Sequence, residues 1–114
     1  MEDCIFCKII NKEIPAEIIY ENEFAVVIKD IHPQASVHVL VIPKKHIKDI
    51  NYIDEMFSAD LLGIHLAVKE AAKVLGVSES GYRLISNCGK NAGQSVFHLH
   101  YHLIAGSNLG EKLL

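Results

Sequence analysis

The sequence predicts an α+β domain in which helices cover an antiparallel sheet. Five segments rich in β-branched and apolar residues are joined mostly by short polar connections, which favours antiparallel pairing. One long segment, 54–75, carries apolar residues at helical spacing. The chain has 114 residues, and this length predicts a single domain, 1–114.

The expected strands are short, as in most antiparallel sheets. The run from Val37 to Ile42 is almost continuously apolar, which is typical of a central strand covered on both faces. Pro43 ends this run, because proline cannot donate to a strand ladder. The five expected strands are Ile18–Tyr20, Phe24–Lys29, Val37–Ile42, Tyr82–Asn87 and Val96–Ala105.

Two helices of unequal length are expected beside these strands. Cys4–Asn11 is a short apolar stretch that fits one or two helical turns. Asp54–Leu75 is the long helix, and Gly76 is a natural stop after it. Its apolar face consists of residues three or four positions apart, namely Phe57, Leu61, Ile64, Val68, Ala71 and Leu75.

Composition excludes several classes of protein. Half of the residues are hydrophobic and the net charge is only −3, so the chain is not of the disordered type. No apolar run approaches the ~20 residues that span a bilayer, so no membrane partner is expected. The pI near 6.1 gives no basic surface for nucleic acid.

The N-terminus and the cysteines predict a cytoplasmic protein. The acidic N-terminus lacks the basic and apolar regions of a signal peptide. The three cysteines are an odd number and do not predict a disulfide scaffold. Arg83 is the single arginine, so phosphate chemistry would rely on histidines, hydroxyls, backbone N–H groups or a metal.

Three histidines, His98, His100 and His102, alternate with apolar residues near the end of the chain. On a strand they project from one face, ~6.6–6.8 Å apart, while Leu99, Tyr101 and Leu103 face the core. A row of buried imidazoles is costly without partners, so the pattern indicates function.

Two kinds of chemistry compete for this row. Imidazole is a common metal ligand and also a nucleophile or acid–base catalyst near pH 6.5. Histidines four residues apart on a strand are too distant to share one ion, which favours phosphoryl or nucleotidyl transfer. His100 would then attack phosphorus and His102 would donate to the phosphate oxygens. The preceding Gly93-Gln94-Ser95 allows close backbone approach and adds side-chain donors.

The sequence from His98 to Ile104, His-Leu-His-Tyr-His-Leu-Ile, resembles the signature of the histidine triad (HIT) family. Four further stretches are similar to its Hint branch, the purine nucleoside phosphoramidases: 4–10 with 12–15, 30–35, 41–46 and 93–97. The resemblance runs from Cys4 to about Gly106. It implies the HIT fold, a five-stranded antiparallel sheet with one long and one short helix, dimerising into a continuous sheet.

The resemblance also implies a hydrolase. His100 would attack the α-phosphate of an adenosine or guanosine 5′-phosphoramidate, the amine would leave, and water would release the nucleoside monophosphate from a nucleotidyl-histidine intermediate. His102 would hydrogen-bond the phosphate, and Ser95 would contact the phosphate or the leaving nitrogen. His98 and His46 would set the tautomer of the nucleophile. Dinucleoside polyphosphate hydrolysis is the enzymatic alternative, and a non-catalytic nucleotide-binding or interaction protein is the other.

For nucleotide binding, the resemblance places Asp30 at the ribose hydroxyls, which a carboxylate can accept in pairs. Asn87, Gly93 and Gln94 would lie at the phosphate or the active-site loop. Five apolar residues fall near positions that line the base pocket, although ordinary core packing explains each equally well: Ile31, Phe6, Ile9, Ile14 and Ile28.

The resemblance also implies a structural zinc ion in some members, held by Cys4, Cys7, His46 and His98. The alternative is a pair of reduced cysteines at a helix start, with His46 and His98 free to orient the nucleophile. No organic cofactor is expected. The remaining histidines are expected to be structural at His38 and at the surface at His32 and His65, and Cys88 to be a free thiol.

Overall fold

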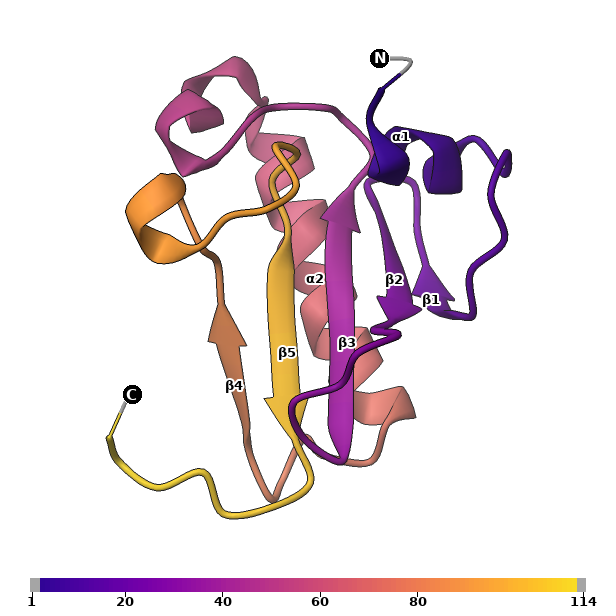
Figure 1. The fold of residues 1–114 in the computed structure, drawn as a ribbon. Helices are drawn as coiled ribbons and strands as arrows, with labels where there is room; N and C mark the ends of the chain where they lie inside the picture. The colour runs from indigo at the N-terminus through magenta and orange to yellow at the C-terminus, as the bar shows by residue number, and fades with distance from the viewer. Residues whose placement is uncertain (1–2, 113–114) are drawn as a thin grey trace.

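The computed structural model describes residues 3–112, which form one five-stranded antiparallel sheet with helices on it (Figure 1). The strand order is β1-β2-β3-β5-β4, and every neighbouring pair is antiparallel. The α+β class and the five strands are therefore confirmed. The strands are β1 (Ile18–Glu21), β2 (Ala25–Lys29), β3 (Val37–Pro43), β4 (Tyr82–Ile85) and β5 (Tyr101–Ala105).

The central strand, β3, is buried on both faces, as its apolar run predicts. Val39 and Val41 face the larger core under α2 (Ser58–Val74), which Figure 1 shows behind the sheet. Leu40 and Ile42 face the other side. That side is covered by α1 (Ile5–Ile10), a short helix that starts with Cys4 as its N-cap.

The long helix begins later than the sequence predicts. Residues Ile50–Glu55 form a separate 3₁₀ helix, η1, and the backbone is extended at Met56 and Phe57 before α2 starts at Ser58. The Phe57 N–H donates to the Asp60 carboxylate at 2.9 Å, which satisfies one free donor of the first turn. Phe57 is 75% exposed, so its assignment to the apolar face of the helix is wrong.

The expected strand 96–105 is regular only over β5, and the expected strand 82–87 ends at Ile85. Residues 96–100 are not paired in the sheet; instead the Leu99 N–H donates to the Ile47 carbonyl at 2.8 Å. A second 3₁₀ helix, η2 (Lys90–Ala92), lies in the loop before them. No helix in residues 3–112 is both long and apolar enough to cross a membrane.

Although the regular strand is shorter than predicted, side chains from His98 to Leu103 still alternate between the two sides of the chain. Leu99 and Leu103 are buried in the core under α2, and Tyr101 packs against it. The histidine side chains lie on the opposite side, where the ring of Phe6 from α1 contacts His98 and His100. His98 and His100 therefore lie on the side of the sheet that α1 covers.

Candidate active site

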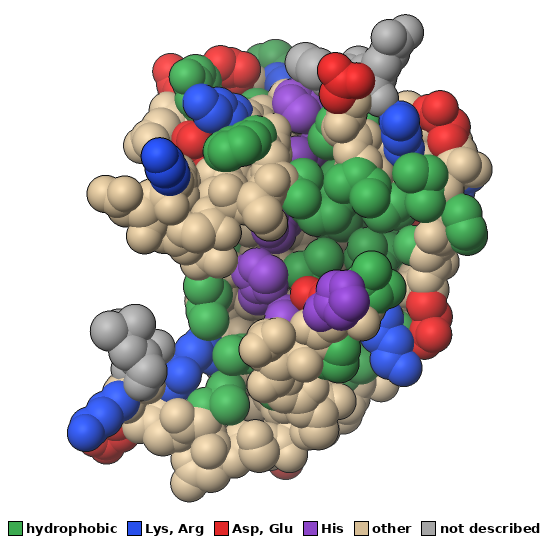
Figure 2. Space-filling view, viewed as in Figure 1, with side chains coloured by type: hydrophobic (Ala, Val, Ile, Leu, Met, Phe, Trp, Pro, Cys, Tyr) green, Lys and Arg blue, Asp and Glu red, His purple; other side chains and the backbone are tan. Residues whose placement is uncertain are grey.

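Histidine side chains gather in a hollow on one face of the molecule, beside a continuous hydrophobic surface (Figure 2). The sheet register explains part of this gathering. Leu40 on β3 pairs with His102 on β5, and His38 lies two residues before Leu40 on the same face. Diagonal neighbours in an antiparallel pair are within reach of long side chains, so His38 can contact His102.

His100 has its ring orientation determined by a backbone carbonyl. Its Nδ1 lies 2.8 Å from the His98 carbonyl oxygen, and since a carbonyl only accepts, Nδ1 carries the proton. In the neutral ring the lone pair is therefore on Nε2. The ring is 6% exposed and meets the Phe6 ring edge-on at 5.0 Å between centroids. His100 thus has the unprotonated Nε2 that a nucleophile requires.

His102 has the opposite tautomer, because a chain of donors reaches it from β3. The Gln34 N–H donates to His38 Nδ1 at 3.0 Å, so the proton of neutral His38 lies on Nε2. His38 Nε2 is 2.9 Å from His102 Nδ1, which must accept. The neutral His102 ring then carries its proton on Nε2, where it can donate to an anionic oxygen.

The surroundings of His102 favour its neutral form. Burial lowers its pKa below 6.5, and the nearby His100 and His38 rings lower it further, while the Asp30 carboxylate acts in the opposite direction. Asp30 Oδ2 lies 3.3 Å from His38 Nε2, so the carboxylate and His102 share the same donor. His38 therefore belongs to the site, although the sequence indicated only a structural residue there. Its partner lies 64 residues further along the chain, and no local pattern signals that contact.

A cavity of about 360 Å³ lies between α1 and β2, and its lining includes Phe6, whose ring contacts that of His100. Phe6, Ile9 and Ile28 are buried in the core on this face and also line the cavity, so packing and lining are compatible roles. Ile31 is 86% exposed at the margin. The structure brings all six residues expected around the nucleoside to this one cavity: Phe6, Ile9, Ile14, Ile28, Asp30 and Ile31.

The loop before the histidines is held together by Gln94. Its Oε1 accepts from the Gly89 N–H at 2.8 Å, and its Nε2 donates to the carbonyls of Lys48 and Val96. The buried amide is thus engaged with backbone groups and shapes the loop. Gly93 has a φ of 79°, in the left-handed region that favours glycine. Asn87 is half-buried between β4 and this loop.

Ser95 lies outside the nucleoside cavity. It is exposed and lines a second cavity of about 440 Å³, together with Phe97, Ile5 and His46. Ile5 lines both cavities and so forms the boundary between them. The structure therefore does not bring Ser95 together with the residues expected around the nucleoside.

Cys4, Cys7, His46 and His98 converge although they come from three separate segments, and their donor atoms lie within 4.8 Å of one another. Cys4 Sγ and Cys7 Sγ are 3.3 and 3.6 Å from His98 Nδ1, and Cys7 Sγ is 3.4 Å from His46 Nδ1. Tetrahedral zinc would separate sulfur and nitrogen ligands by about 3.5 Å. The donor set and its spacing fit zinc.

The His98 ring has its unprotonated nitrogen directed at the cysteine–histidine cluster. Its Nε2–H donates to the Pro43 carbonyl at 2.7 Å, which leaves the Nδ1 lone pair facing the cluster. Burial lowers the pKa of His98 to about 4, and burial with the adjacent Cys4 raises the pKa of Cys7 to about 11. His98 reaches His100 through its carbonyl oxygen, so a ligand role and an orienting role are compatible.

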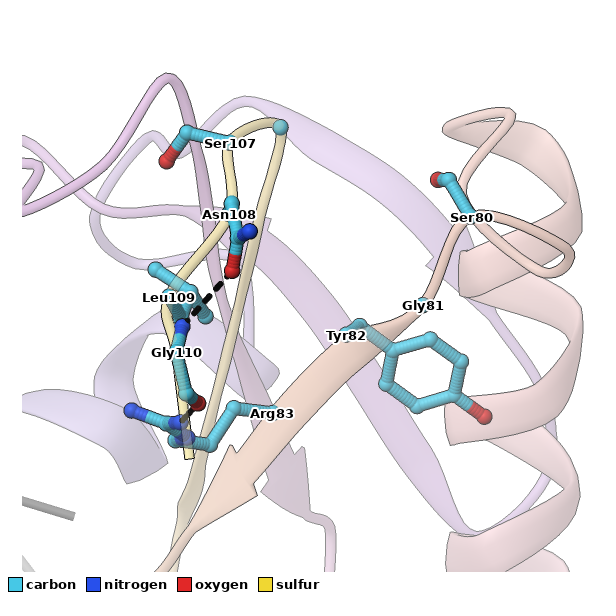
Figure 3. Close-up of a pocket in the computed structure, with 9 residues that line it drawn as sticks. Ser80, Gly81, Tyr82, Arg83, Ser107, Asn108, Leu109 and Gly110 are labelled. Carbon is cyan, nitrogen blue, oxygen red and sulfur yellow. Dashed lines mark hydrogen bonds between the residues drawn. The ribbon is translucent and has the colours of Figure 1, made fainter. Parts of the chain in front are cut away.

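A larger cavity, about 630 Å³, is elsewhere, between β4 and the C-terminal segment (Figure 3). The Arg83 guanidinium, the one cation in its described lining, donates to the Gly110 carbonyl at 2.7 Å. No histidine, cysteine or carboxylate among residues 3–112 lines it. The imidazole, thiol and carboxylate groups described above therefore lie away from this cavity.

Fold and site together define a class of protein: small α+β domains that present hydrogen-bonded imidazoles, one with a free Nε2, beside an apolar cavity. Residues 11–109 match the HIT domain, and the chain belongs to the HIT family. It is 46% identical over 105 residues to an uncharacterised HIT-like protein of Synechocystis, covering 92% of this chain and 91% of that protein.

Two further relatives are hydrolases by name. The purine nucleoside phosphoramidase of Escherichia coli K12 is 38% identical over 112 residues, covering 98% of this chain and 94% of that enzyme. A HIT family hydrolase from Clostridium thermocellum has a TM-score of 0.94 and 54% identity, covering 100% of this chain and 99% of that structure. These similarities support a hydrolase activity in general.

Proposed function

We propose that this protein hydrolyses the P–N bond of purine nucleoside 5′-phosphoramidates. One observation carries the proposal: His100 has a free Nε2, held in that tautomer by the His98 carbonyl, and its ring contacts Phe6, which lines a mainly apolar cavity that also reaches Asp30. A planar base suits the apolar walls formed by Phe6 and the isoleucines. The Asp30 carboxylate suits the ribose hydroxyls. The similarity to a phosphoramidase over nearly the whole chain supports the same reaction.

The proposed reaction has two displacements at phosphorus. His100 Nε2 attacks, the P–N bond breaks, and the leaving nitrogen takes up a proton and departs as an amine. Water then attacks the nucleotidyl-histidine, loses a proton and releases the nucleoside monophosphate and the free ring. The His102 Nε2–H donates to the phosphate oxygens, where charge increases in both transition states. Ser95, which lines the neighbouring cavity, would contact the phosphate or the leaving nitrogen.

A panel of substrates tests this function. We expect turnover of adenosine or guanosine 5′-phosphoramidates to exceed that of diadenosine polyphosphates by at least about 10²-fold, since the single arginine, Arg83, donates to the Gly110 carbonyl and is not available to a polyphosphate leaving group. The reverse preference would indicate a dinucleoside polyphosphate hydrolase. Nucleotide binding without turnover of any compound would indicate a binding or interaction protein.

We further propose that Cys4, Cys7, His46 and His98 hold a structural zinc ion, which would join α1 to the loop after β3 and to the start of the histidine row. Its chemistry would be confined to fixing these segments, since all four positions are filled by the chain. Metal analysis of untagged protein tests this directly. About one zinc ion per chain is expected, and fewer than about 0.2 would contradict the proposal.

The partner proposed for assembly is a second copy of the chain, with the two sheets joined at the free edge of β4. Tyr82 on that edge and Leu62 and Leu66 on α2 are exposed apolar side chains that an interface would cover. Sedimentation should give twice the 12.7 kDa of one chain. Only the single-chain mass at micromolar concentration would contradict it. Cys4, Cys7 and Cys88 form no disulfide in the described residues, which is typical of a reducing compartment, and we propose that the protein is cytoplasmic.

A further inference from the structure

We propose that helix α1 couples metal binding at the cysteine–histidine cluster to nucleoside binding in the cavity, with Phe6 as the positioning residue. This inference rests on the proposed function, because it concerns the same cavity. It assigns to the cluster an effect on substrate affinity in addition to a structural role.

Helix α1 faces both sites, although it is only six residues long. At its start, Cys4 accepts a hydrogen bond from the Cys7 N–H at 3.3 Å through Sγ, and both sulfurs face the cluster. Its Phe6 and Ile9 face the cavity. A helix this short is not stable by itself and depends on such contacts for its position. Whatever binds the two sulfurs therefore also places one wall of the cavity.

Phe6 on α1 contacts one histidine of the cysteine–histidine cluster, His98, and the proposed nucleophile, His100. Its ring is 6% exposed and meets the His98 ring at 5.9 Å and the His100 ring at 5.0 Å, both at 80°. One ring thus contacts a proposed metal ligand, the proposed nucleophile and the cavity. A displacement of α1 by even 1 Å would change all three contacts, because close-packed aromatic rings have no free space to absorb it.

The four ligand atoms also join segments that are otherwise far apart in the chain. His46 and His98 are 2.9 Å apart through their Nδ1 atoms, yet they are separated by 52 residues, and both cysteines lie at the N-terminus. Without a metal, the cluster contributes to the position of α1 only through weak hydrogen bonds that involve the two sulfurs. A metal would order α1, and a nucleoside that packs on Phe6 and Ile9 would order the same helix. Each ligand should then strengthen binding of the other by the same factor.

The experiment measures both affinities. Zinc affinity is determined by competition with a chelator, with and without saturating adenosine 5′-monophosphate. Affinity for the nucleotide is determined by calorimetry on the zinc-loaded and metal-free chain. We expect the nucleotide to tighten zinc binding about 10-fold and zinc to tighten nucleotide binding by the same factor.

Two variants of α1 locate the coupling. In Phe6→Leu the coupling factor should fall below about 3-fold, since the ring that joins the two sites is lost. Ile10→Ala is the matched control, because Ile10 packs on the same core from the same helix but does not line the cavity. That variant should keep the full factor.

Equal nucleotide affinity with and without zinc would overturn the coupling and leave the proposed hydrolase intact. Absence of zinc binding would also overturn the coupling, as would an undiminished factor in Phe6→Leu, because global folding would then link the ligands. If the nucleotide fails to bind the zinc-loaded protein, the proposed function itself is wrong and the coupling falls with it.

Discussion

His98 and His100 lie two residues apart on the same side of the chain, yet they hold their protons on opposite ring nitrogens. His98 donates from Nε2 to the Pro43 carbonyl and turns a bare Nδ1 to two thiols. His100 donates from Nδ1 to the His98 carbonyl and leaves Nε2 bare. The residue type and the alternation are the same, so the carbonyl that each ring reaches decides which nitrogen is free for the proposed role of ligand or nucleophile.

The largest expected effect is at the nucleophile. His100→Ala should reduce phosphoramidate turnover by at least about 10³-fold, because the proposed nucleophile is removed. Zinc content should stay unchanged, since the His98 ring is not altered. His65→Gln, at an exposed ring on α2, is the control and should keep full activity. Hydrolysis that survives His100→Ala would refute the proposed mechanism.

A smaller effect is expected from the ring behind His102. His38→Ala removes the donor that keeps the His102 proton on Nε2, and kcat/KM should fall about 10- to 100-fold. Metal content should again be unaffected, which separates this end of the site from the cluster. Steady-state kinetics with metal analysis of the same sample checks both statements. An unchanged kcat/KM would mean that the tautomer of His102 does not matter.

The lowered pKa of His102 predicts a pH dependence of stability. Since the unfolded ring titrates near 6.5 and the folded ring below it, the unfolded chain binds more protons in the interval between them. The contribution to stability is complete above pH 6.5 and is lost as pH falls through the lowered pKa, with a slope of at most about 1.4 kcal/mol per pH unit. Urea unfolding at pH 7.5 and 5.5 should show a smaller loss for His102→Gln than for the natural chain. Equal losses would contradict it.

The smallest effect concerns the backbone of His100. The Ser86 hydroxyl donates to the His100 carbonyl at 3.0 Å from the segment after β4. Ser86→Ala should cost about 1 kcal/mol of stability and change kcat less than about 3-fold, since the ring keeps its own hydrogen bond. Denaturant unfolding and kinetics measure the two quantities. A loss of activity as large as that of His38→Ala would show that backbone placement matters more than the tautomer.

Regular patterns in the sequence predicted regular parts of the fold. The two-residue period placed Leu99 and Leu103 in the core, and the apolar run placed β3 at the centre. The prediction was wrong where local geometry interrupts a pattern: Phe57 keeps the helical spacing but lies in extended backbone before α2. For Gln94 the sequence predicted a donor near the phosphate, but its amide forms hydrogen bonds with backbone groups of the loop, whose conformation no sequence pattern predicted.

Which side chains share a face follows from the amino-acid order alone, because period-two alternation and the two-residue gap between Cys4 and Cys7 are local properties of a strand and a helical turn. The protonated nitrogen of each histidine, in contrast, depends on contacts that form only in the folded chain. The proton of His98 depends on a carbonyl 55 residues away, and that of His102 on a ring 64 residues away. A tautomer is set by the partner of the other ring nitrogen, and folding is what supplies that partner.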